Sequence, residues 1–352
     1  VMKTTKHTFH FAQLNLPSFQ LVMYAVTVLL LGLGAIFVHD DTLQVGSLSA
    51  LLSYVLQVVN SLMMLSNVFL LLNRSFASSK RLKEILIEEP SLVSKEDGIR
   101  NVESGEITIN NVSFKYHETS AEYVLSHINL QIQAGESVGI LGGTGSGKST
   151  LVSLLLRLYD VSYGEIKIGG YNVKDYDLKA LRDAVAIVLQ SNVLFSGTIR
   201  ENLLWGDPNA TTKEIQEACK IACVDEFLDR LPNGLDYDLG QGGVNVSGGQ
   251  KQRLCIARAL LKHPKVIIFD DSTSACDMET ERRIISGIRS LTEVTSIVIA
   301  QRIVSVMNAD KIIILDNGQI VDVGTHEELL QKSSIYQEMF QQQLGGVVEC
   351  HQ

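Results

Sequence analysis

The segment GGTGSGKST, residues 142–150, has the residue types and spacing of a loop that binds phosphate groups. Glycines let backbone N–H groups close around phosphate oxygens, and a helix that starts at the loop adds the positive end of its dipole. We expect Lys148 to reach the outer phosphates of a nucleotide and Ser149 to hold Mg²⁺. The predicted phosphate-binding residues are Gly142, Gly143, Thr144, Gly145, Ser146, Gly147, Lys148, Ser149 and Thr150.

A second chemical group is the acidic pair that ends the segment VIIFDD, residues 266–271. The apolar run before the pair is typical of a buried strand that delivers its last side chains to a site. Asp270 is therefore expected to be a second Mg²⁺ ligand, either directly or through a water molecule.

The elements that would position these groups follow one another from residue 106 onward. The segments EITINNVSFKY and SHINLQIQAGESVGIL predict short strands, and the phosphate loop is followed by the helical segment TLVSLLLRL. Further apolar strands, AVAIVLQ, KVIIFDD and TSIVIAQ, alternate with helical segments. This alternation predicts an α/β domain with a mostly parallel sheet.

The first part of the chain has a different composition, with no charged residue between Lys6 and Asp40. Residues 19–38 and 48–72 are both long enough to cross a bilayer, which takes ~20 apolar residues. Basic residues flank the two segments on the outside, whereas the intervening HDDTLQVGS has none, so both ends are expected on the cytoplasmic side. These residues are Lys3, Lys6, Arg74, Lys80, Arg81 and Lys83. A signal peptide is the competing interpretation, but its apolar core is shorter and is not followed by a second span.

The predicted division of the 352 residues is a transmembrane part at 1–89, a linker at 90–104, a nucleotide-binding domain at 105–342 and a tail at 343–352. Because the chain begins with Val1 just before the apolar segments, we expect a fragment of a longer membrane protein. The net charge of -9 gives no reason to expect a nucleic-acid partner. The five cysteines have no metal-ligand spacing and are interpreted as reduced.

Four further motifs lead to a family. Tyr116 precedes the phosphate loop, Gln190 ends AIVLQ, VSGGQKQR opens a predicted helix at residue 246, and SACD follows the acidic strand at residue 274. With the loop, these motifs resemble the nucleotide-binding domain of an ATP-binding cassette (ABC) transporter, and the hairpin resembles the last two helices of an exporter half-transporter. The predicted fold class is thus an α-helical transmembrane hairpin followed by an α/β P-loop NTPase domain of the ABC type.

The resemblance implies that two such domains enclose two ATP molecules head to tail, each site pairing one chain's phosphate loop with the other chain's signature sequence. It implies that Tyr116 stacks on adenine and that Gln190 contacts Mg²⁺ and senses the membrane domain. The implied Mg²⁺ ligands are Ser149, Gln190 and Asp270. The implied signature is Val246, Ser247, Gly248, Gly249 and Gln250, and the implied D-loop is Ser274, Ala275, Cys276 and Asp277.

Two positions depart from the family pattern, which has Glu after the Mg²⁺ acid and His in a later strand. Here these catalytic positions are Asp271 and Gln301. Asp is one methylene shorter than Glu, and a 1 Å misplacement can lower a rate ~100-fold. The Gln301 amide cannot exchange a proton as imidazole does. We therefore expect this chain's own site to bind ATP but to hydrolyse it slowly.

The signature departs only by Val246 in place of Leu, so the chain should complete a competent site on its partner. This combination resembles the degenerate-site subunit of heterodimeric bacterial multidrug ABC exporters. Gly240 stands where an acidic residue is more usual, which leaves the role of the loop before the signature open.

The expected function is therefore that of a subunit of an ATP-driven exporter in the cell membrane. Its cofactors would be ATP and Mg²⁺, its partner a second ABC half-transporter, and its cargo a small amphipathic molecule of multidrug or lipid-like type. The alternatives are a slow homodimeric exporter of lipid, peptide or drug, and a non-hydrolysing regulatory ATP-binding module.

One face of the second apolar segment carries four polar side chains and one methionine, spaced three or four residues apart. It consists of Ser53, Gln57, Asn60, Met64 and Asn67. This face is interpreted either as a wall of the substrate path or as a surface for hydrogen bonds between helices.

Overall fold

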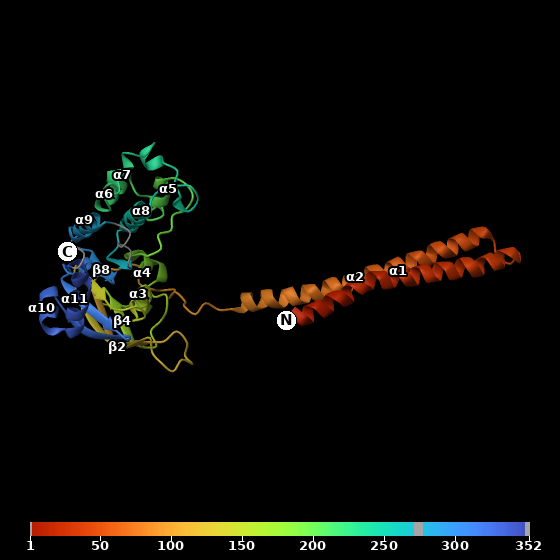
Figure 1. The fold of residues 1–352 in the computed structure, drawn as a ribbon, viewed down its shortest axis with the longest axis horizontal. Helices are drawn as coiled ribbons and strands as arrows, with labels where there is room; N and C mark the ends of the chain where they lie inside the picture. The colour runs from red at the N-terminus through yellow and green to blue at the C-terminus, as the bar shows by residue number, and fades with distance from the viewer. Residues whose placement is uncertain (1, 271–276, 349–352) are drawn as a thin grey trace. The chain divides into compact units, whose positions relative to one another are not determined.

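The computed structural model describes residues 2–270 and 277–348. The chain divides into two compact units, Val1–Pro90 and Ser91–Gln352, and each is described by itself (Figure 1).

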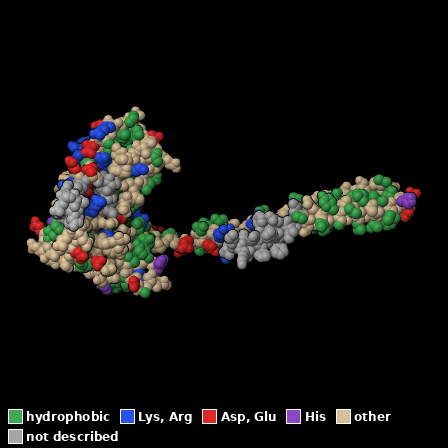
Figure 2. All heavy atoms as spheres, in the orientation of Figure 1, with side chains coloured by type: hydrophobic (Ala, Val, Ile, Leu, Met, Phe, Trp, Pro, Cys, Tyr) green, Lys and Arg blue, Asp and Glu red, His purple; other side chains and the backbone are tan. Residues whose placement is uncertain are grey.

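The first unit is a helical hairpin of α1 (Met2–His39) and α2 (Val45–Ile87). The segments Pro17–His39 and Val45–Ile87 have the length and apolar composition to cross a membrane, with mean hydropathies of 2.5 and 1.9. The helices approach closely at Gly34, where a Cβ atom would lie 2.3 Å from the Leu48 side chain. Figure 2 shows hydrophobic side chains over the surface of the hairpin near its turn. The hairpin predicted from the sequence is confirmed.

The polar face of α2 is directed away from α1. All five of its residues are exposed, whereas the partly buried positions between residues 52 and 67 are Leu52, Val55, Leu56, Val59, Met63 and Ser66. The Ser53 hydroxyl donates to the Ser49 carbonyl one turn earlier, at 3.0 Å. Because its side chains are exposed, this face is open to groups other than those of α1.

The segment predicted as a linker belongs to the second unit from Ser91 onward and contacts the rest of that unit. The Ser94 hydroxyl donates to Asp177 Oδ2 at 2.9 Å, Lys95 pairs with Asp175 at 3.0 Å, and Ile99 forms a bridge to Tyr176.

Two sheets form the framework of the second unit. The four-stranded sheet has the order β2 (Leu125–Ile132), β1 (Ile107–Phe114), β4 (Tyr163–Ile168) and β5 (Tyr171–Asn172). The six-stranded sheet has the order β10 (Gln319–Gly324), β9 (Lys311–Asp316), β3 (Ser137–Leu141), β8 (Thr295–Ala300), β7 (Val266–Asp270) and β6 (Val185–Val188). Its strands are parallel except for β10, so the predicted parallel sheet is confirmed.

Alternation along the strands of the six-stranded sheet produces two cores. In β7, Ile267 and Phe269 pack with the helices, whereas Val266 and Ile268 pack toward the four-stranded sheet. Successive side chains of a strand point to opposite faces, which is why an unbroken apolar run is needed here.

The helices are α3 (Lys148–Leu155), α4 (Leu178–Ala184), α5 (Ile199–Leu204), α6 (Thr212–Ile221), α7 (Asp225–Leu228), α8 (Gly248–Leu260), α9 (Met278–Arg289), α10 (His326–Lys332) and α11 (Ser334–Val348). Figure 1 shows α5, α6, α7 and α8 grouped at one end of the unit, away from β2 and β4. Helix α11 continues past residue 343, where the sequence suggested that a tail begins.

Candidate nucleotide-binding site

The phosphate loop joins β3 to α3, and its glycines are required by its geometry. Gly145 and Gly147 have φ angles of 83° and 101°, a region in which side chains cause strain. Gly147 is also the N-cap of α3, and a Cβ atom there would lie 2.6 Å from the Leu125 side chain. At Gly142 a Cβ atom would meet the Leu315 carbonyl at 2.2 Å. The loop therefore depends on neighbouring strands as well as on its own sequence.

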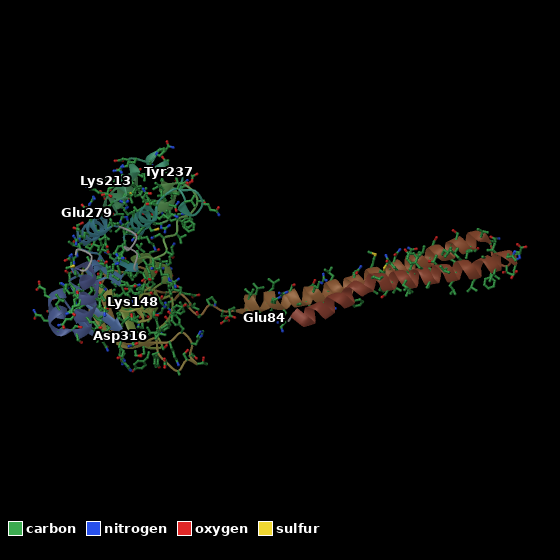
Figure 3. All side chains as sticks on the ribbon, in the orientation of Figure 1. Glu84, Lys148, Lys213, Tyr237, Glu279 and Asp316 are labelled. Atoms are coloured by element: carbon green, nitrogen blue, oxygen red, sulfur yellow. The ribbon has the colours of Figure 1, made fainter. Side chains whose placement is uncertain are left out.

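Lys148, which is labelled in Figure 3, has its ammonium group hydrogen-bonded to the loop itself. Its Nζ atom donates to the carbonyl oxygens of Gly142 and Gly143 at 2.8 and 2.7 Å, and to the Ser146 hydroxyl at 3.3 Å. The Ser146 carbonyl accepts from the Gly318 N–H at 3.1 Å, which ties the loop to the β9–β10 turn. A positive charge beside the loop amides is an arrangement that binds phosphate.

The strand register brings the predicted site residues to one edge of the six-stranded sheet. Leu141, the last residue of β3, pairs with Ala300, and Asp270 pairs with Ile299. Val188, at the end of β6, pairs with Phe269. The phosphate loop, Gln301, Asp270 and Gln190 consequently follow strand ends at the same edge, with neighbouring strands ~4.8 Å apart.

The residues present fit Mg²⁺. Ser149 and Asp270 line the same cavity of 720 Å³, and both offer the hard oxygen atoms that Mg²⁺ prefers. Gln190 does not line this cavity, although its neighbours Leu189 and Ser191 do. Among the described residues there is no cluster of three or more His, Cys, Asp or Glu that could hold a metal. A site with few protein ligands is usual for Mg²⁺ that is bound together with phosphates.

Tyr116 is supported by two aromatic rings and one hydroxyl. Its ring packs edge to face against Phe114 and Tyr159, with centroids at 5.0 and 5.1 Å. Its hydroxyl lies 3.0 Å from the Thr150 hydroxyl, and the side chain remains 46% exposed. The ring is thus fixed in orientation while part of it stays open to a planar group such as adenine. Sequence analysis did not identify Tyr159, which follows the helical segment after the loop without a recognisable motif.

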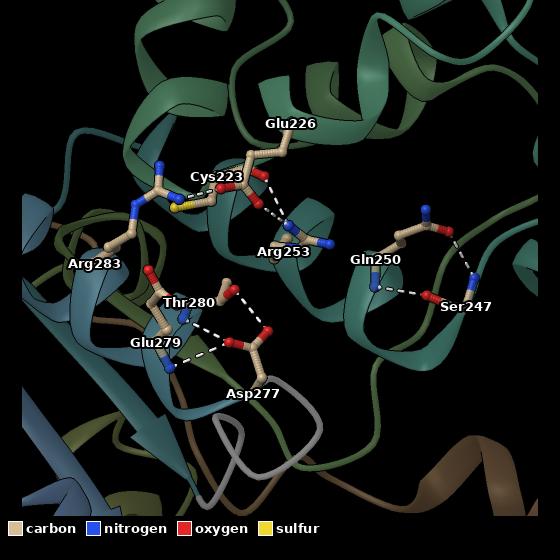
Figure 4. Close-up of polar contacts among 9 residues, drawn as sticks. All are labelled: Cys223, Glu226, Ser247, Gln250, Arg253, Asp277, Glu279, Thr280 and Arg283. Atoms are coloured by element: carbon tan, nitrogen blue, oxygen red, sulfur yellow. Dashed lines mark hydrogen bonds and ion pairs between the residues drawn. The ribbon is translucent and has the colours of Figure 1, made fainter.

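The signature residues begin helix α8. Ser247 is the N-cap: its hydroxyl accepts from the Gln250 N–H at 3.3 Å, and the Gln250 side chain accepts from the Ser247 N–H at 2.8 Å (Figure 4). Val246 is buried, whereas a Cβ atom at Gly248 would have no neighbour within 4 Å. The first-turn N–H groups of a helix lack intrahelical acceptors, so this open end suits an anion.

The signature is not part of the cavity that Ser149 and Asp270 share, since none of residues 246–250 lines it in the described part of the chain. This separation agrees with the implied use of the signature by another subunit's nucleotide.

Asp277 is the N-cap of α9. Its carboxylate accepts from the N–H groups of Thr280 and Glu279 at 2.9 and 3.2 Å and from the Thr280 hydroxyl at 2.7 Å. The hydrogen bond from the Thr280 N–H is the largest cause of its lowered pKa. The other predicted D-loop residues, Ser274, Ala275 and Cys276, lie outside the described residues, as does Asp271.

Gln301 follows β8 directly, and its backbone is held by the C-terminal helix α11. The Gln343 amide donates to the Gln301 carbonyl at 2.9 Å and accepts from the Ile303 N–H at 2.8 Å. Gln343 lies in the segment that the sequence assigned to a tail, so this contact was missed.

Comparisons with known proteins agree with this geometry. Residues 125–274 match the family model described as ABC transporter. An uncharacterized ABC transporter ATP-binding protein, YfiB of Bacillus subtilis (strain 168), is 39% identical over 346 residues, which is 98% of this chain and 60% of that protein. A putative multidrug export ATP-binding/permease protein, YgaD of the same strain, is 40% identical over 306 residues, covering 86% of this chain and 53% of that protein.

A solved structure described as a bacterial Atm1-family ABC exporter with ATP bound has a TM-score of 0.79 and 31% sequence identity to this chain. The match covers 95% of this chain and 59% of that one. The chain thus spans 60% or less of the length of the relatives named here.

The sheet topology, the phosphate loop and the signature helix define an ABC-type nucleotide-binding domain. Residues 125–274 match the ABC transporter family model, and the chain as a whole is similar to exporter-type ABC transporters, as the sequence motifs predicted. The two apolar helices accordingly belong to the membrane, and the nucleotide-binding domain belongs to the cytoplasm.

Proposed function

We propose that this chain is a subunit of an ATP-driven exporter of the multidrug type. The relative named as a multidrug export ATP-binding/permease protein supports this class of transport. The cargo would be a small amphipathic molecule, since the exposed polar face of α2 (Ser53, Gln57, Asn60, Met64 and Asn67) offers hydrogen-bonding groups beside apolar surface.

In the nucleotide site, each residue of this chain has one task. Tyr116 would stack on the base, the loop amides and Lys148 would hold the phosphates, and Ser149 with Asp270 would hold Mg²⁺. Bound Mg²⁺ would neutralise phosphate charge and orient the outer phosphates. Gln190 would join this set on nucleotide binding, since it follows β6 at the same edge of the sheet.

We propose further that this site is degenerate and that the working site belongs to a different partner subunit. The observation that carries this proposal is the contrast between Gln301, an amide at the position of the expected His, and the open signature at the start of α8. Gln301 can donate a hydrogen bond but cannot exchange a proton. The Ser247–Gln250 cap presents helix N–H groups that a partner's ATP can reach.

The experiment that tests the pairing is purification of the full-length transporter through a tag on this chain, followed by mass measurement of the complex. The proposal requires that the complex contains two different chains. It also requires that the partner's site continues to hydrolyse ATP when this chain carries Lys148→Ala. A complex of one chain type, inactivated by Lys148→Ala, favours the slow homodimeric exporter. A chain that binds ATP but supports no turnover with any membrane partner favours the regulatory module.

A further inference from the structure

Glu226, on the short helix α7, binds two arginines that come from two other helices (Figure 4). Its Oε2 atom accepts from Arg253 Nη1 at 2.8 Å, and its Oε1 atom pairs with Arg283 Nη1. Arg253 lies in α8 and Arg283 lies in α9. One carboxylate therefore connects the helix that starts with the signature to the helix that starts with the D-loop residue Asp277.

The two arginines occupy equivalent places in their helices. Arg253 follows the N-cap Ser247 by six residues, and Arg283 follows the N-cap Asp277 by six residues. Both ion pairs with Glu226 therefore lie less than two helical turns from the N-terminal ends of α8 and α9. The resemblance places these two ends at the ATP sites between two nucleotide-binding domains. A shift at Glu226 would be transmitted to these ends through short, rigid helical segments.

Arg253 is the less exposed member of the network, with 16% of its side chain accessible. Its Nη1 atom also donates to the Cys223 carbonyl at 3.0 Å, and its guanidinium lies 4.9 Å from the centre of the Phe227 ring. Phe227 is itself in the core, so Arg253 is held by a carboxylate and a ring of α7 and by a carbonyl of the turn before α7. A charge in such surroundings needs its partner, because removing one member of the pair leaves the other desolvated and unpaired.

We propose that Glu226 is a positioning residue that fixes the signature helix α8 against the D-loop helix α9, so that the signature reaches the partner's ATP in the geometry needed for hydrolysis. This inference rests on the proposed function, in which the signature serves a site on the partner subunit. Small displacements matter at such a site, because a 1 Å misplacement of a catalytic group can lower a rate ~100-fold.

The test uses the assembled, full-length transporter with Glu226→Gln, which keeps the size of the side chain and removes its charge. We expect kcat for ATP to fall by about tenfold or more, with the ATP concentration at half-saturation changing by less than about twofold, since the signature acts after ATP has bound the partner's phosphate loop. Arg283→Met removes only the ion pair with α9 and should also lower kcat. Arg283→Lys keeps a positive charge at this position, so its kcat should stay close to that of the native transporter.

The matched control is Asp236→Asn, which breaks the Arg200–Asp236 pair at 2.9 Å near α5. That pair joins neither α8 nor α9, so kcat should stay unchanged. The proposal is overturned if Glu226→Gln lowers only the thermal unfolding temperature, with kcat per folded complex unchanged, or if the control variant loses as much kcat.

Each variant is measured with and without Lys148→Ala in the same chain. Turnover that survives Lys148→Ala belongs to the partner's site, and its loss on Glu226→Gln supports the positioning role there. If Lys148→Ala alone abolishes turnover, the heterodimer proposal fails, and the variants with Lys148 intact still decide whether Glu226 positions the signature.

Discussion

The Tyr116 hydroxyl lies 3.0 Å from the Thr150 hydroxyl, so the aromatic residue expected to carry adenine is tied to the first turn of the helix that follows the phosphate loop. The residues proposed to bind the base and the phosphates are thus joined by one side-chain contact across 34 residues of sequence.

This contact predicts graded effects at Tyr116. Tyr116→Ala should weaken ATP binding by about 1–3 kcal/mol, the scale of stacking between a base and an aromatic ring. Tyr116→Phe keeps the ring and should weaken ATP binding by only about 0.5–1.5 kcal/mol, which is the net value of one hydrogen bond. Calorimetric titration of ATP into the folded protein measures both.

Thr150→Val is the matched control for the hydroxyl pair. Thr150→Val and Tyr116→Phe together should weaken ATP binding by less than the sum of the single effects, because both remove the same hydrogen bond. Full additivity would show that the two hydroxyls act independently, and a loss for Tyr116→Phe as large as that for Tyr116→Ala would show that the ring face is unimportant.

The glycines of the phosphate loop should differ in their tolerance of a methyl group. Gly147 combines a φ of 101° with a Cβ position 2.6 Å from Leu125, whereas a Cβ atom at Gly143 meets nothing within 4 Å. Gly147→Ala should therefore weaken ATP binding by about 1–3 kcal/mol through backbone strain, and Gly143→Ala should have little effect. Equal affinities of the two variants, measured in the same titration, would contradict the loop geometry.

Three cysteines should not react with alkylating reagents in the folded protein. Cys219, Cys223 and Cys255 are buried, and burial raises the pKa of each thiol, for Cys219 to about 12. A raised pKa lowers the thiolate fraction at pH 8, and only the thiolate is nucleophilic. Peptide mapping after iodoacetamide treatment should find these residues alkylated in denaturant and unmodified without it. Rapid native alkylation of Cys219 would refute its placement in the core.

Asp277 predicts a specific dependence of stability on pH. Its pKa in the folded protein lies below the ordinary value of 3.8, because its carboxylate caps α9. The ionised Asp277 carboxylate therefore stabilises the folded protein. This stabilisation is complete well above pH 3.8 and is lost as the pH falls through the lower, folded-state pKa. Asp277→Asn should therefore unfold at a lower temperature than the native protein at pH 7, with the difference shrinking in acid. A difference that stays constant between pH 7 and pH 3 would contradict this assignment.

The features that could be predicted from the sequence are those with a local cause. The phosphate loop depends on glycine spacing, and β7 depends on an unbroken apolar run that fills both cores. The hairpin follows from two long uncharged segments.

The features that were missed depend on pairs of residues far apart in the chain. Glu226 meets Arg253 and Arg283 across 27 and 57 residues, and Gln343 meets Gln301 across 42. Charged and amide side chains are common on helix surfaces, so no spacing rule distinguishes these from solvated ones. Only the packing of α7, α8 and α9, and of α11 against the turn after β8, brings them together.

If this chain binds ATP in a degenerate site and completes a working site on its partner, substitutions at two of its residues should have opposite effects on ATP hydrolysis. If, as we propose, Asp271 is too short for efficient proton transfer, Asp271→Asn should leave most ATPase activity of the assembled transporter intact. Gly248→Asp should suppress turnover by orders of magnitude, because it places a carboxylate where the signature meets the partner's γ-phosphate. The open space around Gly248 lets the helix accept the side chain without refolding.

The most direct measurement is therefore the steady-state ATPase rate of the assembled transporter with each substitution, after assembly has been verified by mass. The account predicts a rate near that of the native complex for Asp271→Asn and a nearly complete loss for Gly248→Asp. If Asp271→Asn is as damaging as Gly248→Asp, Asp271 is a working catalytic base and the degenerate-site account is contradicted.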